Sequence, residues 1–289
     1  TYYTNNTCTT TTTTSHGASA NGGAPSLVGN YYVKASAAAV SQKTNAATSG
    51  CIAHTITAST PTVSLSPKEA TYSGAAIAAN TATVSPNSNP TITYAYYTDS
   101  GCSTATTNAN SGAASNGAAP VYAGQYYVKA SAAAVTGKTA AATSGCISHK
   151  INPKPVTVTA GTSSRAWNGS ALTNSGCTAN ALGTGDSVTC TMTSGSTITL
   201  ASTTIGTSAS VNNVINTVTI KKGANDVSAS YTITKANGTL TISYANPTIS
   251  LTAKTTAWTG SAIAANTATA SPNSSPTMTY TYYTNNTCT

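Results

Sequence analysis

The first nine residues of the chain, TYYTNNTCT, recur letter for letter as its last nine, at a spacing of 280 residues. A match of this length indicates tandem duplication, and repetition at a fixed period is the signature of architectures in which similar units follow one another. The duplication therefore predicts that these residues are a window on a longer array, which continues in both directions with a period of 280 residues.

Shorter repeats within this period divide the chain into domains. Residues 61–102 match residues 247–288, and residues 124–151 match residues 29–56. An aromatic-x-glycine motif at Trp167 marks a third, more distant copy. We therefore expect the C-terminal part of a domain at 1–58, complete domains at 59–152 and 153–244, and the N-terminal part of the next domain, of the same type as 1–58, at 245–289.

Segments that alternate with a period of two residues predict short strands. In residues 91–98 the alternation places Ile92, Tyr94 and Tyr96 on one face. Residues 124–130, 196–200 and 277–283 read in the same way, and no segment has a convincing helical period. Strands rich in β-branched residues and separated by Gly, Asn and Pro predict an all-β fold of tandem immunoglobulin-like β-sandwich domains, end to end. Prolines at the predicted joints favour a semi-rigid rod.

Composition narrows the possible functions. Charged residues make up 6% of the chain, and the net charge of +8 comes from scattered basic residues rather than a cluster, so we expect no specific nucleic-acid partner. Calcium usually needs several carboxylates, and the chain has four Asp and Glu in total. His16, His54 and His149 are dispersed, and no motif ties them to a nucleophile or a carboxylate, so we interpret them as structural. We predict no enzyme activity, no catalytic or metal site, no cofactor and no transmembrane segment within these residues.

The seven cysteines reduce to two per domain once the repeat is applied. Cys288 is the next copy of Cys8 and is expected to pair with a cysteine outside these residues. Two cysteines in an independent domain allow a single pairing, and the chain has no CxxC pair that would favour a metal. Disulfides indicate an oxidising, extracellular compartment. The predicted disulfides are Cys8 with Cys51, Cys102 with Cys146, and Cys177 with Cys190.

Adjacent tyrosines are the best candidates for a surface contact. Neighbouring residues of a strand face opposite sides, so one ring of each pair should pack inward and the other should lie outside. An exposed aromatic patch would suit glycan stacking or lateral packing of fibres. Simple covering of the outer face of the sheet is the alternative, and we favour it. The outward tyrosines are predicted to be Tyr32, Tyr97, Tyr127 and Tyr283.

The middle domain resembles a known family of repeats. Its segments KPVTVTAGTSSRAWNGSALT, GTGDSVTCTMT and NTVTIKKGANDVSASYTITKANGTLTI are similar to tyrosine-x-glycine immunoglobulin-like repeats, of the MBG or YDG type, in bacterial surface adhesins. The flanking domains, with YYT, a cysteine, a glycine-rich loop and YYVKA, resemble related bacterial repeats. Trp167 and Trp258 stand where tyrosine is usual, which we expect to leave the packing intact. The resemblance implies a surface-exposed stalk or fibre and carries no catalytic residues.

The function predicted from the sequence is therefore mechanical. We expect a structural repeat of a long extracellular fibre or adhesin stalk at the bacterial cell surface, stabilised by disulfides within its domains. Its partners would be further copies in the same chain, and laterally in a fibre. Two alternatives stay open: adhesive repeats that bind glycans or mucins, and a pilus-like subunit that polymerises by strand exchange. The duplicated nonapeptide opposes the last, because a completed domain would hold that strand twice.

Overall fold

A computed structural model describes residues 1–200, 207–271 and 275–289. The chain is all-β, and the helical elements of the described residues are short: α1 (Asn108–Ser111), η1 (Thr14–His16) and η2 (Ser228–Ser230). Two compact units, Thr1–Asn152 and Pro153–Thr289, are described separately below. The division falls at a proline joint where the sequence predicts a domain boundary.

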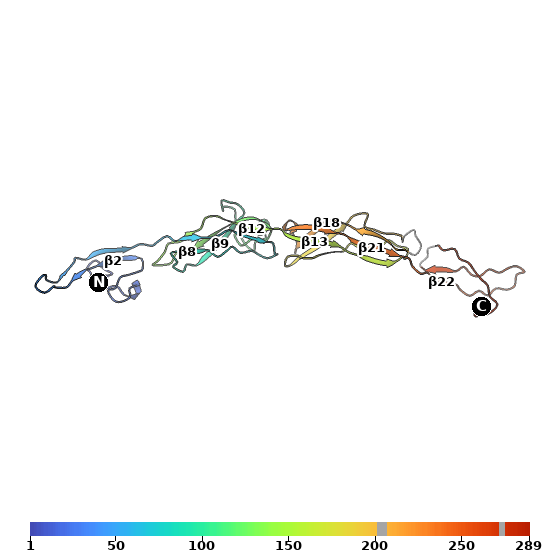
Figure 1. The fold of residues 1–289 in the computed structure, drawn as a ribbon, viewed down its shortest axis with the longest axis horizontal. Helices are drawn as coiled ribbons and strands as arrows, with labels where there is room; N and C mark the ends of the chain where they lie inside the picture. The colour runs from blue at the N-terminus through green and yellow to red at the C-terminus, as the bar shows by residue number, and fades with distance from the viewer. Residues whose placement is uncertain (201–206, 272–274) are drawn as a thin grey trace. The chain divides into compact units, whose positions relative to one another are not determined.

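Residues 59–152 form two facing sheets. The smaller sheet is the antiparallel pair β6 (Thr62–Ser64) and β8 (Thr83–Ser85). In the larger sheet β10 lies between β9 and β12, and β7 adds to the far edge of β12 in parallel. Strands β8, β9 and β12 are labelled in Figure 1. The chain thus crosses from one sheet to the other between β6 and β7. The strands of the larger sheet are β7 (Lys68–Thr71), β9 (Ile92–Tyr97), β10 (Gly124–Ala132), β11 (Ala142–Thr143) and β12 (Ile147–Asn152).

The core of this domain lies between the two sheets. Alternate residues of β10 point inward, so Ala130 and Ala132 are buried against Val63 of β6, with Tyr94 of β9 packed beside them. The predicted inward face of residues 91–98 is therefore confirmed. Gly124 opens β10 because a Cβ atom there would lie 3.1 Å from the Tyr126 ring, closer than ordinary contact. Side chains that are buried between two facing sheets are typical of the packing of a β-sandwich.

The N-terminal segment repeats the larger sheet. β2 lies between β1 and β5, and Tyr2 pairs with Val33 as Tyr96 pairs with Val128 in residues 59–152. A strand equivalent to β7 is not found on the outer edge of β5 among the described residues. That edge is therefore open. The strands are β1 (Tyr2–Tyr3), β2 (Gly29–Val33), β3 (Ser36–Ala37), β4 (Ala47–Thr48) and β5 (Ile52–Ile56).

Two backbone contacts join this segment to the following domain. The carbonyl of Ser59 accepts a hydrogen bond from the N–H of Ala140 at 2.9 Å, next to a parallel bridge between Ser59 and Thr139. The N–H of Val28 donates to the carbonyl of Gly137 at 2.7 Å. The loop of residues 135–139 is therefore bound by both the linker and the preceding segment.

The second unit begins with residues 153–244. The first two strands of this unit belong to different sheets: β13 runs parallel to β20, and β14 runs parallel to β21. Ile198, Leu240 and Ile242 form a buried cluster, with Trp167 packed against it. The predicted strand at 196–200 is reduced to a single bridge between Ile198 and Leu172, so that prediction was wrong. The strands are β13 (Lys154–Ala160), β14 (Ser163–Ala166), β15 (Cys177–Ala179), β16 (Asp186–Met192), β17 (Ala209–Asn213), β18 (Ile215–Lys222), β19 (Asn225–Asp226), β20 (Tyr231–Ala236) and β21 (Gly238–Ser243).

The C-terminal segment keeps only its smaller sheet. β22 (Thr248–Ser250) and β23 (Thr269–Ser271) pair in the register of β6 and β8, 186 residues earlier. Residues 277–283 form no strand, contrary to the sequence prediction. The equivalent strand β9 is held by its ladder to β10, and no strand pairs with residues 277–283 among the described residues. The alternating pattern alone therefore does not make residues 277–283 a strand, because a strand forms only when a second strand pairs with it.

Candidate functional site

Three disulfides cross-link the β-structure, and their partners are those predicted from the repeat. The Cα atoms lie 5.9 Å apart in Cys8–Cys51 and in Cys102–Cys146, and 6.2 Å apart in Cys177–Cys190. The first two bonds span 43 and 44 residues, and the third spans 13. A longer closed loop restricts the unfolded chain more, so the first two contribute the larger stabilisation. Cys288 is a free, exposed thiol, and its predicted pairing outside these residues stays a prediction.

The loop before each long disulfide is shaped by a side chain three residues ahead of the cysteine. The carboxylate of Asp99 accepts a hydrogen bond from the N–H of Thr104 at 2.6 Å, and this bond is the main reason why the pKa of Asp99 falls to about 2. Cys102 itself has a φ of 52°, in the left-handed region. Asn5 and Cys8 repeat the arrangement, with a φ of 51° at the cysteine. The hydrogen-bonded side chain and the left-handed backbone of the cysteine together fix the turn from which the sulfur forms its disulfide.

The predicted outward tyrosines lie in cross-strand pairs. Tyr97 of β9 and Tyr127 of β10 are directly opposite each other, as are Tyr3 of β1 and Tyr32 of β2. All four are half-buried, and Tyr283 is exposed. The sequence prediction omitted Tyr3, although Tyr3 is the repeat copy of Tyr97 and Tyr283. The pairs therefore form short aromatic strips on the outer face, each about two rings wide, and the strips retain part of their ring surface in contact with solvent.

A basic side chain borders one of these strips. The Nζ atom of Lys34 lies 5.9 Å from the centre of the Tyr3 ring, within the range of a cation–π contact. Lys129 holds the equivalent position beyond Tyr127 on β10. An aromatic strip with a cation at one end is a surface that sugar rings and their anionic substituents can contact.

Tyr96 and Tyr2, the inward-facing neighbours of Tyr97 and Tyr3 in the sequence, each pack against a histidine. The rings of Tyr96 and His149 meet edge to face with centroids 5.3 Å apart, and those of Tyr2 and His54 do so at 5.4 Å. The Tyr96 hydroxyl accepts a hydrogen bond from the N–H of Ala79 at 2.7 Å. His149 is fully buried by this contact, whereas His54 is half-buried.

His149 makes the stability of its domain dependent on pH. Burial lowers the pKa of His149, and the nearby Lys68 lowers it further, while the backbone of Ile77 offsets part of the shift. In the unfolded chain a histidine titrates near pH 6.5, so below that value the unfolded state binds a proton that the folded state does not. The contribution of neutral, buried His149 to the free energy of unfolding is therefore fully present above about pH 6.5. It is lost as the pH falls towards the lower folded-state pKa.

We expect the free energy of unfolding of residues 59–152 to fall between pH 6.5 and 5, with a slope of at most about 1.4 kcal/mol per pH unit. The window is clean because His149 is the only histidine in this domain, and the pKa values of Glu69 and Asp99 are lowered. Urea denaturation followed by hydrogen exchange of domain peptides measures the slope. The variant His149→Phe should have a flat profile, and a flat profile in the unaltered protein would contradict the assignment.

A buried carboxylate organises one end of the middle domain. Asp186 accepts a hydrogen bond from the Tyr231 hydroxyl at 2.6 Å, and that hydroxyl accepts one from the N–H of Gly183 at 2.6 Å. The Nζ atom of Lys222 lies 3.7 Å from the other Asp186 oxygen. Burial, reinforced by the bond to Asp186, raises the pKa of Tyr231 to about 12. The cluster joins β16, β18 and β20.

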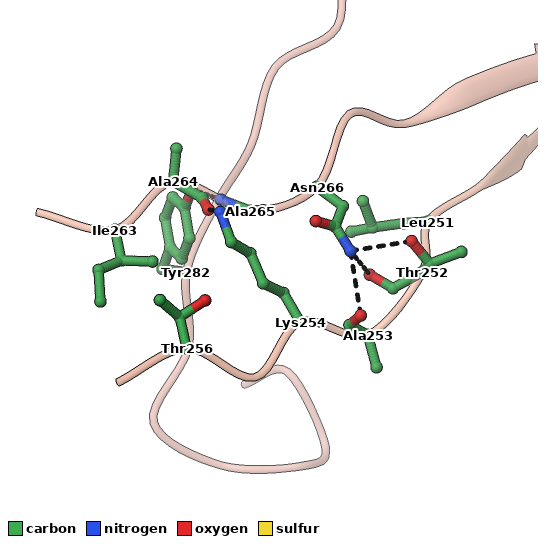
Figure 2. Close-up of a pocket in the computed structure, with 10 residues that line it drawn as sticks. All are labelled: Leu251, Thr252, Ala253, Lys254, Thr256, Ile263, Ala264, Ala265, Asn266 and Tyr282. Atoms are coloured by element: carbon green, nitrogen blue, oxygen red, sulfur yellow. Dashed lines mark hydrogen bonds between the residues drawn. The ribbon is translucent and has the colours of Figure 1, made fainter. Parts of the chain in front are cut away.

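The C-terminal segment contains an open pocket of about 400 Å³. Figure 2 shows the Lys254 side chain reaching towards Ala264, whose carbonyl accepts a hydrogen bond from it at 2.7 Å, beside the Tyr282 ring. Asn266 donates hydrogen bonds to Thr252 and to the carbonyl of Ala253. The lining is a mixture of apolar side chains and satisfied polar groups. It lacks a cluster of titratable groups that would suggest catalysis. The lining residues are Leu251, Thr252, Ala253, Lys254, Thr256, Ile263, Ala264, Ala265, Asn266 and Tyr282.

Comparison with known proteins gave no match, either to a protein family or to an individual curated protein. Within residues 1–200, 207–271 and 275–289, no group of three or more His, Cys, Asp or Glu side chains is placed to hold a metal ion. In the same residues no helix is long and apolar enough to cross a membrane.

Proposed function

We propose that the chain is part of a tandem array of immunoglobulin-like β-sandwich domains, whose role is mechanical, in an extracellular bacterial surface fibre or adhesin stalk. The observation that carries the proposal is one disulfide in each of the segments 1–58, 59–152 and 153–244, in a sequence whose first nine residues recur after 280 residues. Disulfides persist in oxidising compartments, which supports an extracellular site. Repetition without a catalytic cluster favours length and tensile strength over chemistry.

The disulfides suit a chain under tension. An unfolded segment extends by about 3.4 Å for each residue, and residues between two bonded cysteines cannot extend. The bond Cys102–Cys146 removes 44 residues from the extensible length, and Cys177–Cys190 removes 13. Each domain that unfolds under load therefore lengthens the fibre less than a reduced domain would.

The joint between the first two β-segments supports a stiff connection. The carbonyl of the linker residue Ser59 accepts a hydrogen bond from Ala140, directly after the loop of residues 135–139, and Val28 donates one to Gly137 within that loop. These contacts restrict bending without a metal ion, which matches the scarcity of carboxylates. A semi-rigid spacer projects further than a flexible chain of the same length.

Single-molecule pulling on the chain tests the mechanical role. Reduction is expected to add roughly 150 Å to the unfolding length of residues 59–152 and roughly 45 Å to that of residues 153–244, at about 3.4 Å per released residue. The matched controls are Cys102→Ser with Cys146→Ser, and Cys177→Ser with Cys190→Ser, which should show these gains without reductant. Domains that extend at negligible force would contradict a tensile role.

Surface location is a separate test of the same proposal. Antibodies raised against residues 59–152 should label unpermeabilised producing cells, along filaments that project from the surface. Labelling that requires permeabilisation would exclude the extracellular assignment.

The opposed tyrosine pairs favour a second candidate function, which is binding of cell-surface glycans. Tyr97 with Tyr127, and Tyr3 with Tyr32, provide partly accessible ring faces on the outside of the sheet. A glycan array probed with the whole chain, and with the variant Tyr97→Ser with Tyr127→Ser, separates the two. Robust binding that the variant loses would make the repeats adhesive, and absence of binding leaves a spacer.

A further inference from the structure

The outward tyrosine pair of residues 59–152 lies among short side chains. Tyr127 on β10 is directly opposite Tyr97 on one side and Ser148 of β12 on the other. Ala95 precedes Tyr97 on the same face of β9. Because these neighbours are small, the two rings are the highest points of this part of the sheet. A sugar ring can therefore lie flat on them, with its C–H groups against the electron-rich ring faces.

A lysine follows each tyrosine pair at the same place in the sequence. Lys129 comes two residues after Tyr127 on β10, so its side chain lies on the same face, roughly 7 Å further along the strand. Lys34 follows Tyr32 by the same two residues, and its Nζ atom lies 5.9 Å from the centre of the Tyr3 ring. Both copies thus combine an aromatic pair with a cation on one face.

These two lysines differ from a third lysine on the same face. The charge of Lys150 is already neutralised, because its Nζ atom lies 3.2 Å from the carboxylate of Glu69. Within the described part of the chain, neither Lys34 nor Lys129 lies within salt-bridge distance of a carboxylate. Residues 1–58 contain no Asp or Glu, and the net charge of the whole chain is +8. The cations beside the tyrosine pairs are therefore available to an anionic ligand, which the charge of the chain attracts.

We infer that each tyrosine pair with its lysine binds an acidic polysaccharide built of uronic acid units. A pyranose ring stacked on the tyrosines presents its carboxylate, which is attached directly to the ring, to the lysine two residues further along the strand. A neutral glycan gains the stacking contact without the ion pair, so the lysine determines the charge class of the ligand. The two sites consist of Tyr97, Tyr127 and Lys129, and of Tyr3, Tyr32 and Lys34.

Two such sites suit a polymeric ligand. A polysaccharide carries many equivalent units, so binding at one site raises the local concentration of units at the other. This inference rests on the second candidate function above, the binding of glycans, and narrows it to acidic ones. It leaves the mechanical proposal unaffected, since pulling and surface labelling do not depend on a ligand.

Titration of the whole chain with a galacturonic acid hexamer, followed by NMR, tests the inference. The hexamer should bind about fivefold more tightly than a neutral galactose hexamer, the upper value for an exposed ion pair, and high salt should remove the difference. The variant Lys34→Gln with Lys129→Gln should lose this preference. The matched control Lys43→Gln with Lys150→Gln lowers the net charge equally and should keep it, because Lys43 is an exposed loop residue and Lys150 is paired with Glu69. Circular dichroism checks that each variant is folded.

Three results would overturn the inference. Equal affinity for the two hexamers would exclude a role for the lysines and would leave glycan binding as a candidate. An equal loss with the control pair, or equally tight binding of inorganic polyphosphate, would show that net charge rather than the tyrosine site attracts the ligand. Self-association that Tyr97→Ser with Tyr127→Ser abolishes, detected by light scattering without any binding of the hexamers, would assign this face to a second copy of the chain.

Discussion

Replacing Tyr72 with alanine is expected to lower the free energy of unfolding of residues 59–152 by about 3 to 5 kcal/mol, the range for removing a large buried aromatic side chain. The ring is fully enclosed, and the backbone N–H of Tyr72 donates to the carbonyl of Asn152 at 2.9 Å, so the first part of the domain is fixed to the last strand at this residue. Urea denaturation with hydrogen exchange of peptides from this domain measures the loss.

The repeat provides a matched control at Trp258. The variant Trp258→Ala removes a larger side chain from the equivalent position, yet it should change stability by less than about 0.5 kcal/mol because the ring is solvent-exposed. Trp167→Ala should fall between the two, since Trp167 packs against the edge of a buried cluster. Equal costs at Tyr72 and Trp258 would mean that the C-terminal segment is covered in solution.

Removal of Cys102–Cys146 is the second large effect. The variant Cys102→Ala with Cys146→Ala should lose about 4 kcal/mol, from the chain entropy of a closed loop of this length. Because a small domain has only about 5 to 15 kcal/mol in total, such a loss brings residues 59–152 close to unfolding at 37 °C. Thermal denaturation and limited proteolysis of the full chain, each with peptide mapping, measure it.

The shorter bond provides the comparison. Cys177→Ala with Cys190→Ala should cost about 3 kcal/mol, roughly 1 kcal/mol less, because the closed loop is shorter. Tryptophan fluorescence follows this domain selectively, since Trp167 is half-buried and Trp258 is already exposed. A larger loss at the shorter bond would show that the entropy of the unfolded chain is not the main contribution.

The features that could be predicted from the sequence are the disulfide pairing and the side of the strand on which each side chain lies. The three disulfides follow from two cysteines per repeat unit, and the inward positions of Tyr96 and Tyr126 follow from strand alternation. Both inferences depend on local rules that hold wherever the chain sits. The tandem immunoglobulin-like arrangement depends on more than local rules and remains part of the proposal.

Predictions that depend on a distant partner were less reliable. Residues 277–283 have the strand pattern, but no strand of the described residues pairs with them, and Ile198 makes a single bridge where five residues of strand were expected. Trp258 was expected to pack as Tyr72 does, and it is exposed because none of the strands within residues 1–200, 207–271 and 275–289 covers it. Side-chain pattern determines which face is apolar, whereas only the rest of the domain determines whether that face is buried.

The outward tyrosines show the same contrast between what the local side-chain pattern predicts and what depends on a distant partner. Period two correctly identified Tyr97 and Tyr127 as the outward members of their pairs. That they lie directly opposite each other is a matter of register, which is set by the turns and the core rather than by either strand alone. Tyr3 was identifiable from the 280-residue repeat, which makes it a copy of Tyr283.

The parallel pairing of β7 with β12 determines how this domain resists being pulled apart. Force on the two ends of the domain draws the parallel strands past each other along their own axes. In this shear geometry the hydrogen bonds of the ladder stretch together, whereas opposed ends of a hairpin would open one bond at a time, like a zipper. The parallel pairs β13 with β20 and β14 with β21 have the same geometry in the next domain. Because several hydrogen bonds must break at once in this geometry, we expect each of these domains to unfold only at a high applied force.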